Sequence, residues 1–220
     1  AILWRVRGAP AAAGVLGGAS PAISGQLAVL PFSSGELVAV LSATGRRLWS
    51  EALSGGRGGV AMTEVADVSG DPVIFGAGVI AANATGAMLA IDARNGRRGW
   101  RRDIGADDPV WAVAASVFAL DREGRLLRLV GATGETMWET PLPLWEDPED
   151  REGAIAYGGP VAAGGRVYVT SSEDAILVFD AETGAEVERV ELPSRATAGP
   201  VIAGGTLYVL AEDGTVHAFR

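Results

Sequence analysis

Short apolar runs alternate with polar, glycine-rich turns along the whole chain. Clear examples are "RVYVT" (166–170), "AILVFD" (175–180) and "TLYVL" (206–210). Within such runs apolar and polar positions alternate with a period of two, and glycine, asparagine, aspartate and threonine separate them, which favours hairpins over helices. No stretch longer than about ten residues shows the 3.6-residue period of an amphipathic helix. The pattern therefore predicts an all-β protein.

A proline followed by an apolar run recurs as a landmark. It appears at Pro21, Pro72, Pro109, Pro160 and Pro200, with spacings of 51, 37, 51 and 40 residues, a range typical of propellers and solenoids. After each proline the sequence predicts strand A, a glycine turn, strand B, a polar turn, strand C, a Thr-Gly or Asn-Gly turn and strand D. Four antiparallel strands per repeat describe a β-propeller blade, so the chain is expected to hold five repeats, beginning near residues 21, 72, 109, 160 and 200.

The turn between strands C and D carries a second signature, a glycine followed four residues later by tryptophan. "TGRRLW", "NGRRGW" and "TGETMW" end at Trp49, Trp100 and Trp138, whereas "TGAEVE" places Glu188 at that position. The glycine supplies the positive φ of a tight hairpin, and Asp92 or Asp180 can cap the turn. We expect each indole to lie between neighbouring blades and to donate to the adjacent turn. The predicted structural docking residues are Trp4, Trp49, Trp100 and Trp138, with the turn glycines Gly45, Gly96, Gly134 and Gly184.

The two ends of the sequence suggest incomplete blades. Residues 1–7, which include "AILWRV", resemble an isolated outer strand D with its own Trp4, and the fifth repeat lacks a strand D. One interpretation is a five-bladed ring in which the first strand completes the last blade and removes two open edges. The other is a piece of a larger propeller. On either interpretation residues 1–220 are expected to form a single propeller domain or propeller fragment.

The amino-acid composition excludes several classes of partner and of catalytic or metal site. A formal charge of −9 disfavours nucleic acid as a partner, and the absence of cysteine excludes thiolate sites within the chain. With His217 as the single histidine, His-clustered metal sites and Ser-His catalysis are also excluded within it. We expect His217 to be a packed or edge residue. No apolar run approaches the roughly 20 residues of a membrane-spanning helix. The acidic run 145–152, "WEDPEDRE", could bind calcium or a basic partner, but its spacing favours a solvated loop.

The repeated sequence motif, A-x-D-x-x-T/N-G-x-x-x-W, resembles the tryptophan-docking repeat of pyrroloquinoline-quinone-type propellers. Three segments are also similar to the BamB family of outer-membrane β-barrel assembly (BAM) factors: 17–49, "TEVADVSGDPVI" from Thr63, and "LYVLAEDGTVHAFR" at 207–220. The resemblance implies that the chain is the C-terminal five-blade part of an eight-bladed ring. It also implies a non-catalytic scaffold without a cofactor, which binds the POTRA domains of BamA at the periplasmic face of the bacterial outer membrane. Membrane attachment would come from a lipid anchor outside this chain.

Three long connections from strand D to the next strand A are predicted on one face of the propeller: 8–20, 54–71 and 143–159. Function on repeat scaffolds tends to lie on such loops. By the resemblance, the first two contact BamA, and alignment on the prolines gives Val15, Leu16, Asp67 and Ser69 as partner-binding residues. Leu16 replaces a family arginine and Ser69 a family aspartate, so the charge pattern is only partly kept. The structural alternative is that Leu16 packs under its own loop and Asp67 caps a turn.

Two other classes of protein share this architecture. A quinoprotein dehydrogenase would hold its quinone on the propeller axis with charged residues, a metal and usually a vicinal cysteine pair. The chain has no cysteine, and its strand A and B runs, such as "VIAGGTLYVL" at 201–210, offer almost nothing that could bind a quinone or a divalent cation. A periplasmic or extracellular interaction propeller with a different partner is the third possibility. The non-catalytic scaffold is preferred.

Overall fold

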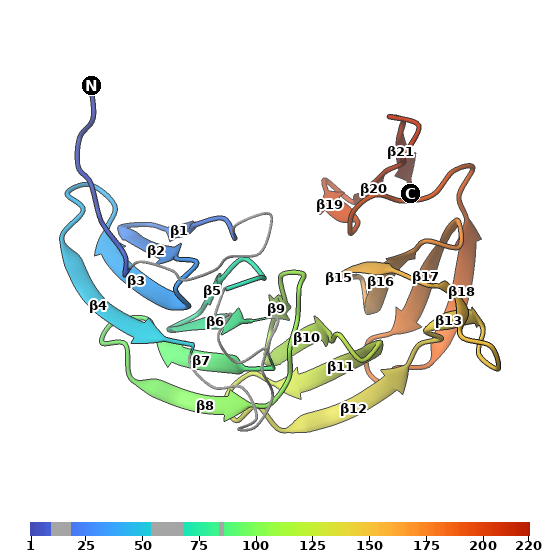
Figure 1. The fold of residues 1–220 in the computed structure, drawn as a ribbon, viewed down its shortest axis with the longest axis horizontal. Helices are drawn as coiled ribbons and strands as arrows, with labels where there is room; N and C mark the ends of the chain where they lie inside the picture. The colour runs from blue at the N-terminus through green and yellow to red at the C-terminus, as the bar shows by residue number, and fades with distance from the viewer. Residues whose placement is uncertain (10–18, 54–67, 84–85) are drawn as a thin grey trace. The chain divides into compact units, whose positions relative to one another are not determined.

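The chain folds entirely into antiparallel β-sheets in its described parts, which are residues 1–9, 19–53, 68–83 and 86–220 of a computed structural model. Four sheets have four strands in chain order, and the last has three (Figure 1). A two-stranded hairpin lies between the third and fourth of these sheets in sequence. The prediction of an all-β fold with four-stranded blades is confirmed. No helix long and apolar enough to cross a membrane occurs among the described residues.

The chain divides into two compact units, and the first comprises residues 1–112 with 131–134. Its sheets have the order β1-β2-β3-β4 and β5-β6-β7-β8. The strands are β1 (Ala22–Ser24), β2 (Leu27–Pro31), β3 (Glu36–Leu41), β4 (Arg47–Ala52), β5 (Val73–Phe75), β6 (Gly78–Ala82), β7 (Met88–Asp92) and β8 (Arg98–Arg102). The facing sides of these two sheets share one core, which includes Leu37, Trp49, Leu89 and Ile91.

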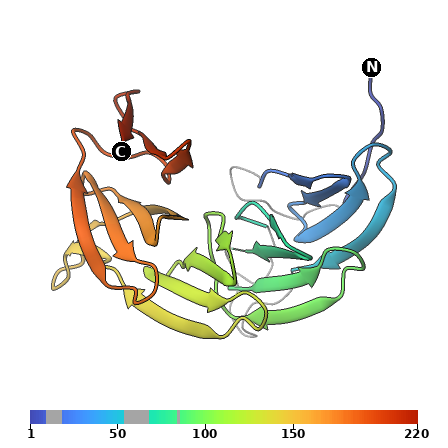
Figure 2. The ribbon, with the colours of Figure 1, turned by 180° about the vertical axis from the view of Figure 1, so that it is seen from behind.

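The second unit comprises residues 113–130 and 135–220. The third sheet, β12-β11-β10-β9, contains the boundary between the units. The sheets β15-β16-β17-β18 and β19-β20-β21 follow it in the chain and are drawn in orange to red in Figure 2. The strands of these three sheets and of the hairpin are β9 (Trp111–Val113), β10 (Ser116–Leu120), β11 (Arg125–Val130), β12 (Thr136–Pro141), β13 (Trp145–Asp147), β14 (Glu152–Ala154), β15 (Tyr157–Ala163), β16 (Arg166–Ser171), β17 (Ala175–Asp180), β18 (Glu186–Glu191), β19 (Val201–Ala203), β20 (Thr206–Leu210) and β21 (Val216–Phe219). Ile176, Val178, Leu207 and Val209 form a core between the last two sheets.

Each four-stranded sheet contains a β-bulge at the same place, opposite the end of strand C. In the first sheet Ala39 pairs with Trp49 and Val40 with Arg47, which leaves Leu48 as the extra residue of strand D. The same shift leaves out Gly99, Met137 and Val187 in the next three sheets. A bulge bends the strand and re-aims the following side chain. Here that side chain is the docking tryptophan or Glu188.

Two segments differ from expectation. No strand is assigned to residues 1–9, because no neighbouring strand in the described chain offers them a hydrogen-bonding ladder. The acidic run 145–152, expected as a solvated loop, forms most of a hairpin in which Trp145 pairs with Ala154 and Asp147 with Glu152. Its tip is closed locally, since the Asp147 carboxylate accepts the N–H groups of Glu149 and Asp150. Its glutamates remain exposed, as a polar surface hairpin allows.

Candidate functional site

The two connections predicted to bind a partner are described only at their ends. Val15, Leu16 and Asp67 lie outside the described residues, and Ser69 lies within them. The Asp71 carboxylate accepts the Ser20 N–H at 2.5 Å, so the C-terminal ends of both connections meet. At the start of the first connection, the Glu36 carboxylate accepts the Ala9 N–H at 3.0 Å. The described ends are therefore fixed to the sheets of the first unit.

Ser69 is held by the next connection along the chain. It is half-buried, and its hydroxyl donates to the Ala106 carbonyl over 2.7 Å. The neighbouring Gly70 approaches the backbone so closely that a Cβ there would lie 2.8 Å from the Asp108 carbonyl oxygen. Val68 is buried in the core below. The Ser69 hydroxyl thus has a partner within the chain, and its predicted role in partner binding remains a prediction.

A fully buried asparagine links the start of the connection 54–71 to the segment that holds its end. Asn83, at 0% exposure, donates through Nδ2 to the Leu53 carbonyl at 3.0 Å and accepts the Ala87 N–H through Oδ1 at 2.8 Å. Its own carbonyl accepts the Ala106 N–H at 3.3 Å. Asn83 therefore joins the ends of strands β4 and β6 to the segment that also holds Ser69. The burial of Asn83 is not predictable from the sequence, because a single asparagine beside a turn gives no signal of burial.

Trp49, Trp100 and Trp138 each connect one sheet to the next, and Trp4 connects residues 1–9 to the first sheet. Trp4, Trp49, Trp100 and Trp138 donate through Nε1 to the carbonyls of Ser42, Ala93, Gly131 and Ala181, at 2.9, 2.8, 2.9 and 3.1 Å. Each ring covers the turn glycine of that next repeat: a Cβ on Gly134, for example, would lie 2.6 Å from Cδ2 of Trp100. Positive φ and this close contact together require glycine at the turn.

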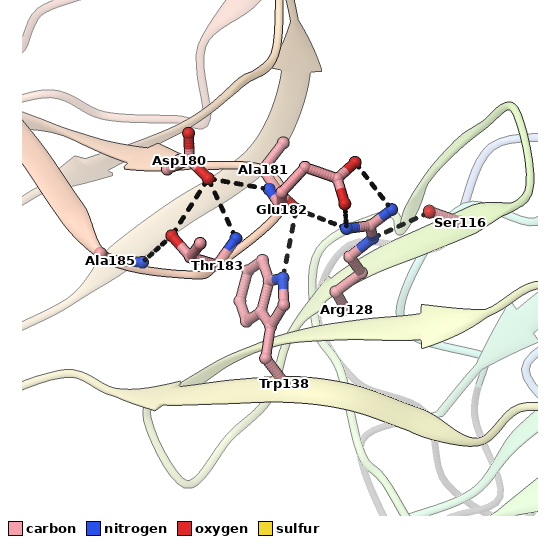
Figure 3. A network of polar contacts seen from close by, with 8 residues as sticks. All are labelled: Ser116, Arg128, Trp138, Asp180, Ala181, Glu182, Thr183 and Ala185. Carbon is pink, nitrogen blue, oxygen red and sulfur yellow. Dashed lines mark hydrogen bonds and ion pairs between the residues drawn. The ribbon is translucent and has the colours of Figure 1, made fainter.

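Trp138 shares its acceptor with an arginine whose side chain is 11% exposed (Figure 3). The Arg128 guanidinium donates to the Ala181 carbonyl at 3.0 Å, to the Glu182 carboxylate at 2.7 and 3.2 Å, and to Ser116 Oγ at 2.9 Å. The aspartate caps of the neighbouring turns are confirmed: Asp180 accepts the N–H of Thr183 at 3.0 Å, and Asp92 that of Arg94 at 2.8 Å. These polar groups stabilise the sheet junctions and offer no vacant coordination site.

Acidification should weaken the junction between the third and fourth sheets. Hydrogen bonds from Thr183 lower the pKa of Asp180, and the hydrogen bond from Arg128 lowers that of Glu182. A lowered folded-state pKa adds stability above the unfolded value of about 4, and this stability is lost as the pH falls through the folded-state pKa. We expect Asp180→Asn and Glu182→Gln to lower the thermal midpoint at neutral pH and to flatten its fall towards about pH 3, measured by calorimetry.

The exposed Glu212 provides the control for this titration, because its carboxylate has no hydrogen bond or ion pair in the described chain. Glu212→Gln should leave the profile unchanged. A wild-type-shaped profile in both junction variants would contradict the assignment.

Charged and metal-ligating side chains are dispersed over the described part of the chain. Within those residues, no three or more histidine, cysteine, aspartate or glutamate side chains are grouped so that they could hold a metal ion. The arginines and carboxylates nearest to one another are paired, as in Arg125 with the buried Asp121 and, at the surface, Arg98 with Glu51. The described ends of the long connections are held by hydrogen bonds to neighbouring segments.

Comparison with known proteins assigns the family. The model of the family described as outer membrane protein assembly factor BamB matches residues 1–140 and 142–220. The chain belongs to the BamB family. BamB of Kangiella koreensis is 29% identical over 174 residues, and that of Escherichia coli strain K12 is 26% identical over 203 residues. These alignments cover 79% and 92% of this chain but 42% and 50% of the relatives, so the chain spans about half their length.

Solved structures agree on the fold. BamB from Moraxella catarrhalis superposes with a TM-score of 0.84 at 19% identity, covering 99% of this chain and 63% of that one. A quinohemoprotein alcohol dehydrogenase from Pseudomonas putida HK5 superposes with a TM-score of 0.67 at 14% identity, over 92% of this chain and 40% of that one. At these identities both show the β-propeller fold alone.

Proposed function

We propose that this chain is part of a non-catalytic scaffold of the outer-membrane β-barrel assembly complex, which binds the POTRA domains of BamA. Membership of the BamB family over nearly the whole sequence carries the proposal. The complete protein would lie at the periplasmic face of the outer membrane, held by a lipid anchor outside residues 1–220. Residues 1–220 would be part of one eight-bladed propeller domain.

The described ends of the two long connections support this surface. The bond from Ser20 to Asp71 holds them together, and Ser69, Asn83 and Ala106 connect the second to the sheets below. Loops fixed at their ends lose less conformational entropy on binding than free ones, so a rigid base favours recognition by a partner. Val15, Leu16, Asp67 and Ser69 are the proposed contacts, with an apolar centre of Val15 and Leu16 and a polar rim.

The double variant Leu16→Glu plus Asp67→Arg tests this surface. In a pull-down with purified POTRA domains of the cognate BamA, we expect binding to fall by about tenfold or more. Leu16→Glu places a charge in the apolar centre, and Asp67→Arg reverses the charge at the rim. A matched control makes the same kinds of change elsewhere, at the exposed Val201 and Glu212: Val201→Glu plus Glu212→Arg should bind like the wild type. Unchanged binding by the first variant would remove this surface from consideration.

The similarity to a quinohemoprotein alcohol dehydrogenase makes the enzyme the second candidate. Reconstitution with pyrroloquinoline quinone and calcium distinguishes the two classes. The scaffold proposal expects no saturable quinone binding by fluorescence quenching and no dye reduction with alcohols. Saturable binding accompanied by turnover would replace the scaffold with an oxidoreductase.

A further inference from the structure

The fourth sheet departs from the docking pattern at a single position. Glu188 pairs with Val178 in the same register that places Trp138 opposite Arg128 and Trp100 opposite Ala90. The preceding bulge is also kept, so the backbone still aims this side chain as it aims the indoles. Glu188 is exposed, and its carboxylate has no hydrogen bond or ion pair among the residues that the structure describes.

A pocket of about 460 Å³ opens beside Glu188, between the last two sheets of the second unit. Its apolar lining comes from β16 to β21 and consists mainly of Tyr168, Ile176, Val178, Ile202, Leu207 and Phe219. Glu188 and Arg220 contribute the charged groups, and Arg220 Nε donates to Thr206 Oγ1 at 3.4 Å. At the three preceding junctions an indole occupies the corresponding strand D position, where this junction has a carboxylate.

Strand β18 also presents an open edge. In its sheet it pairs with β17 only, and five of its six residues are exposed. The strand carries a net negative charge. Arg189 is paired with Glu186 at 3.3 Å and with Glu173 at 4.0 Å, and neither Glu188 nor Glu191 has an ion-pair partner among the described residues, although Arg220 lines the same pocket as Glu188. An open edge can accept an extended peptide through main-chain hydrogen bonds, while adjacent pockets select its side chains.

We propose that the edge of β18 and this pocket bind an extended segment of a partner protein. The segment adds as a further strand beside β18, inserts an aromatic side chain into the pocket, and places an arginine or lysine near Glu188 and Glu191. Aromatic character follows from the indoles at the equivalent junctions, and basic character from the two unpaired carboxylates. This surface is separate from the two connections proposed to bind BamA and does not depend on that function.

The probe is a fluorescein-labelled peptide of alternating arginine and valine with one central tryptophan, and the readout is fluorescence anisotropy on the whole chain. We expect saturable binding that weakens with added salt. Glu188→Trp should lower the affinity by about tenfold, because the new ring fills the pocket and removes the carboxylate. Val190→Trp, which fills the same pocket from a half-buried position and keeps Glu188, should give a similar loss.

Two controls make the result specific. Glu212→Gln removes an exposed carboxylate elsewhere in the second unit and should bind the peptide like the wild type. Replacing the tryptophan of the peptide by serine should weaken binding about fivefold or more. Absence of saturable binding would overturn the proposal, as would equal affinity of the wild type and both tryptophan variants with native circular dichroism. Either result leaves the POTRA pull-down unaffected, since that experiment changes different residues.

Discussion

Trp49→Ala should unfold at a markedly lower denaturant concentration than the wild type. The ring is 7% exposed, belongs to the core shared by the first two sheets, and donates to the Ala93 carbonyl at 2.8 Å. Removing a buried aromatic ring costs about 3–5 kcal/mol of the free energy of unfolding, because the cavity is not filled by relaxation. Denaturation followed by circular dichroism in urea measures the loss.

Two further variants separate the ring from its hydrogen bond. Trp49→Phe keeps most of the apolar surface and loses the N–H donor, so it should cost less, about 1–2 kcal/mol. Trp138→Ala should also cost less than Trp49→Ala, since Trp138 is only half-buried. If Trp49→Ala were no less stable than Trp138→Ala, the docking geometry described for the first junction would be wrong.

Asn83→Leu should destabilise the first unit by about 3 kcal/mol, although leucine has nearly the same size. The substitution leaves the Leu53 carbonyl and the Ala87 N–H without their buried partner. Buried polar groups that lose a hydrogen bond cost about 1–3 kcal/mol each. Because Asn83 also joins the two ends of the connection 54–71, the proposed binding to POTRA domains should weaken together with stability. Urea denaturation and the pull-down are the two measurements.

The matched control is the other asparagine, Asn95, which lies exposed in a C-to-D turn. Its side chain accepts the Arg97 N–H at 2.9 Å, and the three equivalent turns have threonine. Asn95→Thr should therefore change stability by less than about 0.5 kcal/mol. If Asn83→Leu lowered the free energy of unfolding by no more than Asn95→Thr does, the hydrogen bonds of Asn83 would not stabilise the first unit.

The architecture was predictable because its signals are local and repeated. Prolines at the start of strand A, turn glycines and alternating apolar runs determine strand type and order without knowledge of distant contacts. The aspartate caps at Asp92 and Asp180 follow from the same turn chemistry. The bulge before each tryptophan was not predictable, since a single extra residue appears only when two strands are paired in register.

The candidate site was less accessible from sequence. The family resemblance gave Val15, Leu16, Asp67 and Ser69 as contacts. The hydrogen bond from Ser69 to Ala106 could not be predicted, because Ala106 lies 37 residues further along the chain. Asn83 and Arg128 are polar residues whose burial results from neighbouring sheets, and no local pattern indicates it. The acidic hairpin at 145–154 was missed for the converse reason, because a run of carboxylates resembles a solvated loop regardless of its backbone.

Each of the four docking tryptophans contacts the turn glycine of the repeat that follows it in the chain. The pairs that must remain compatible during evolution, such as Trp49 with Gly96 and Trp100 with Gly134, therefore cross the boundaries of the repeated sequence. A duplicated or deleted repeat stays compatible with its neighbours only if it carries a turn glycine for the ring before it and a ring for the glycine after it. Substitutions at either member should covary between adjacent repeats rather than within one. One sequence repeat is the unit that is duplicated or deleted, whereas the contacts that constrain it are made between two adjacent repeats.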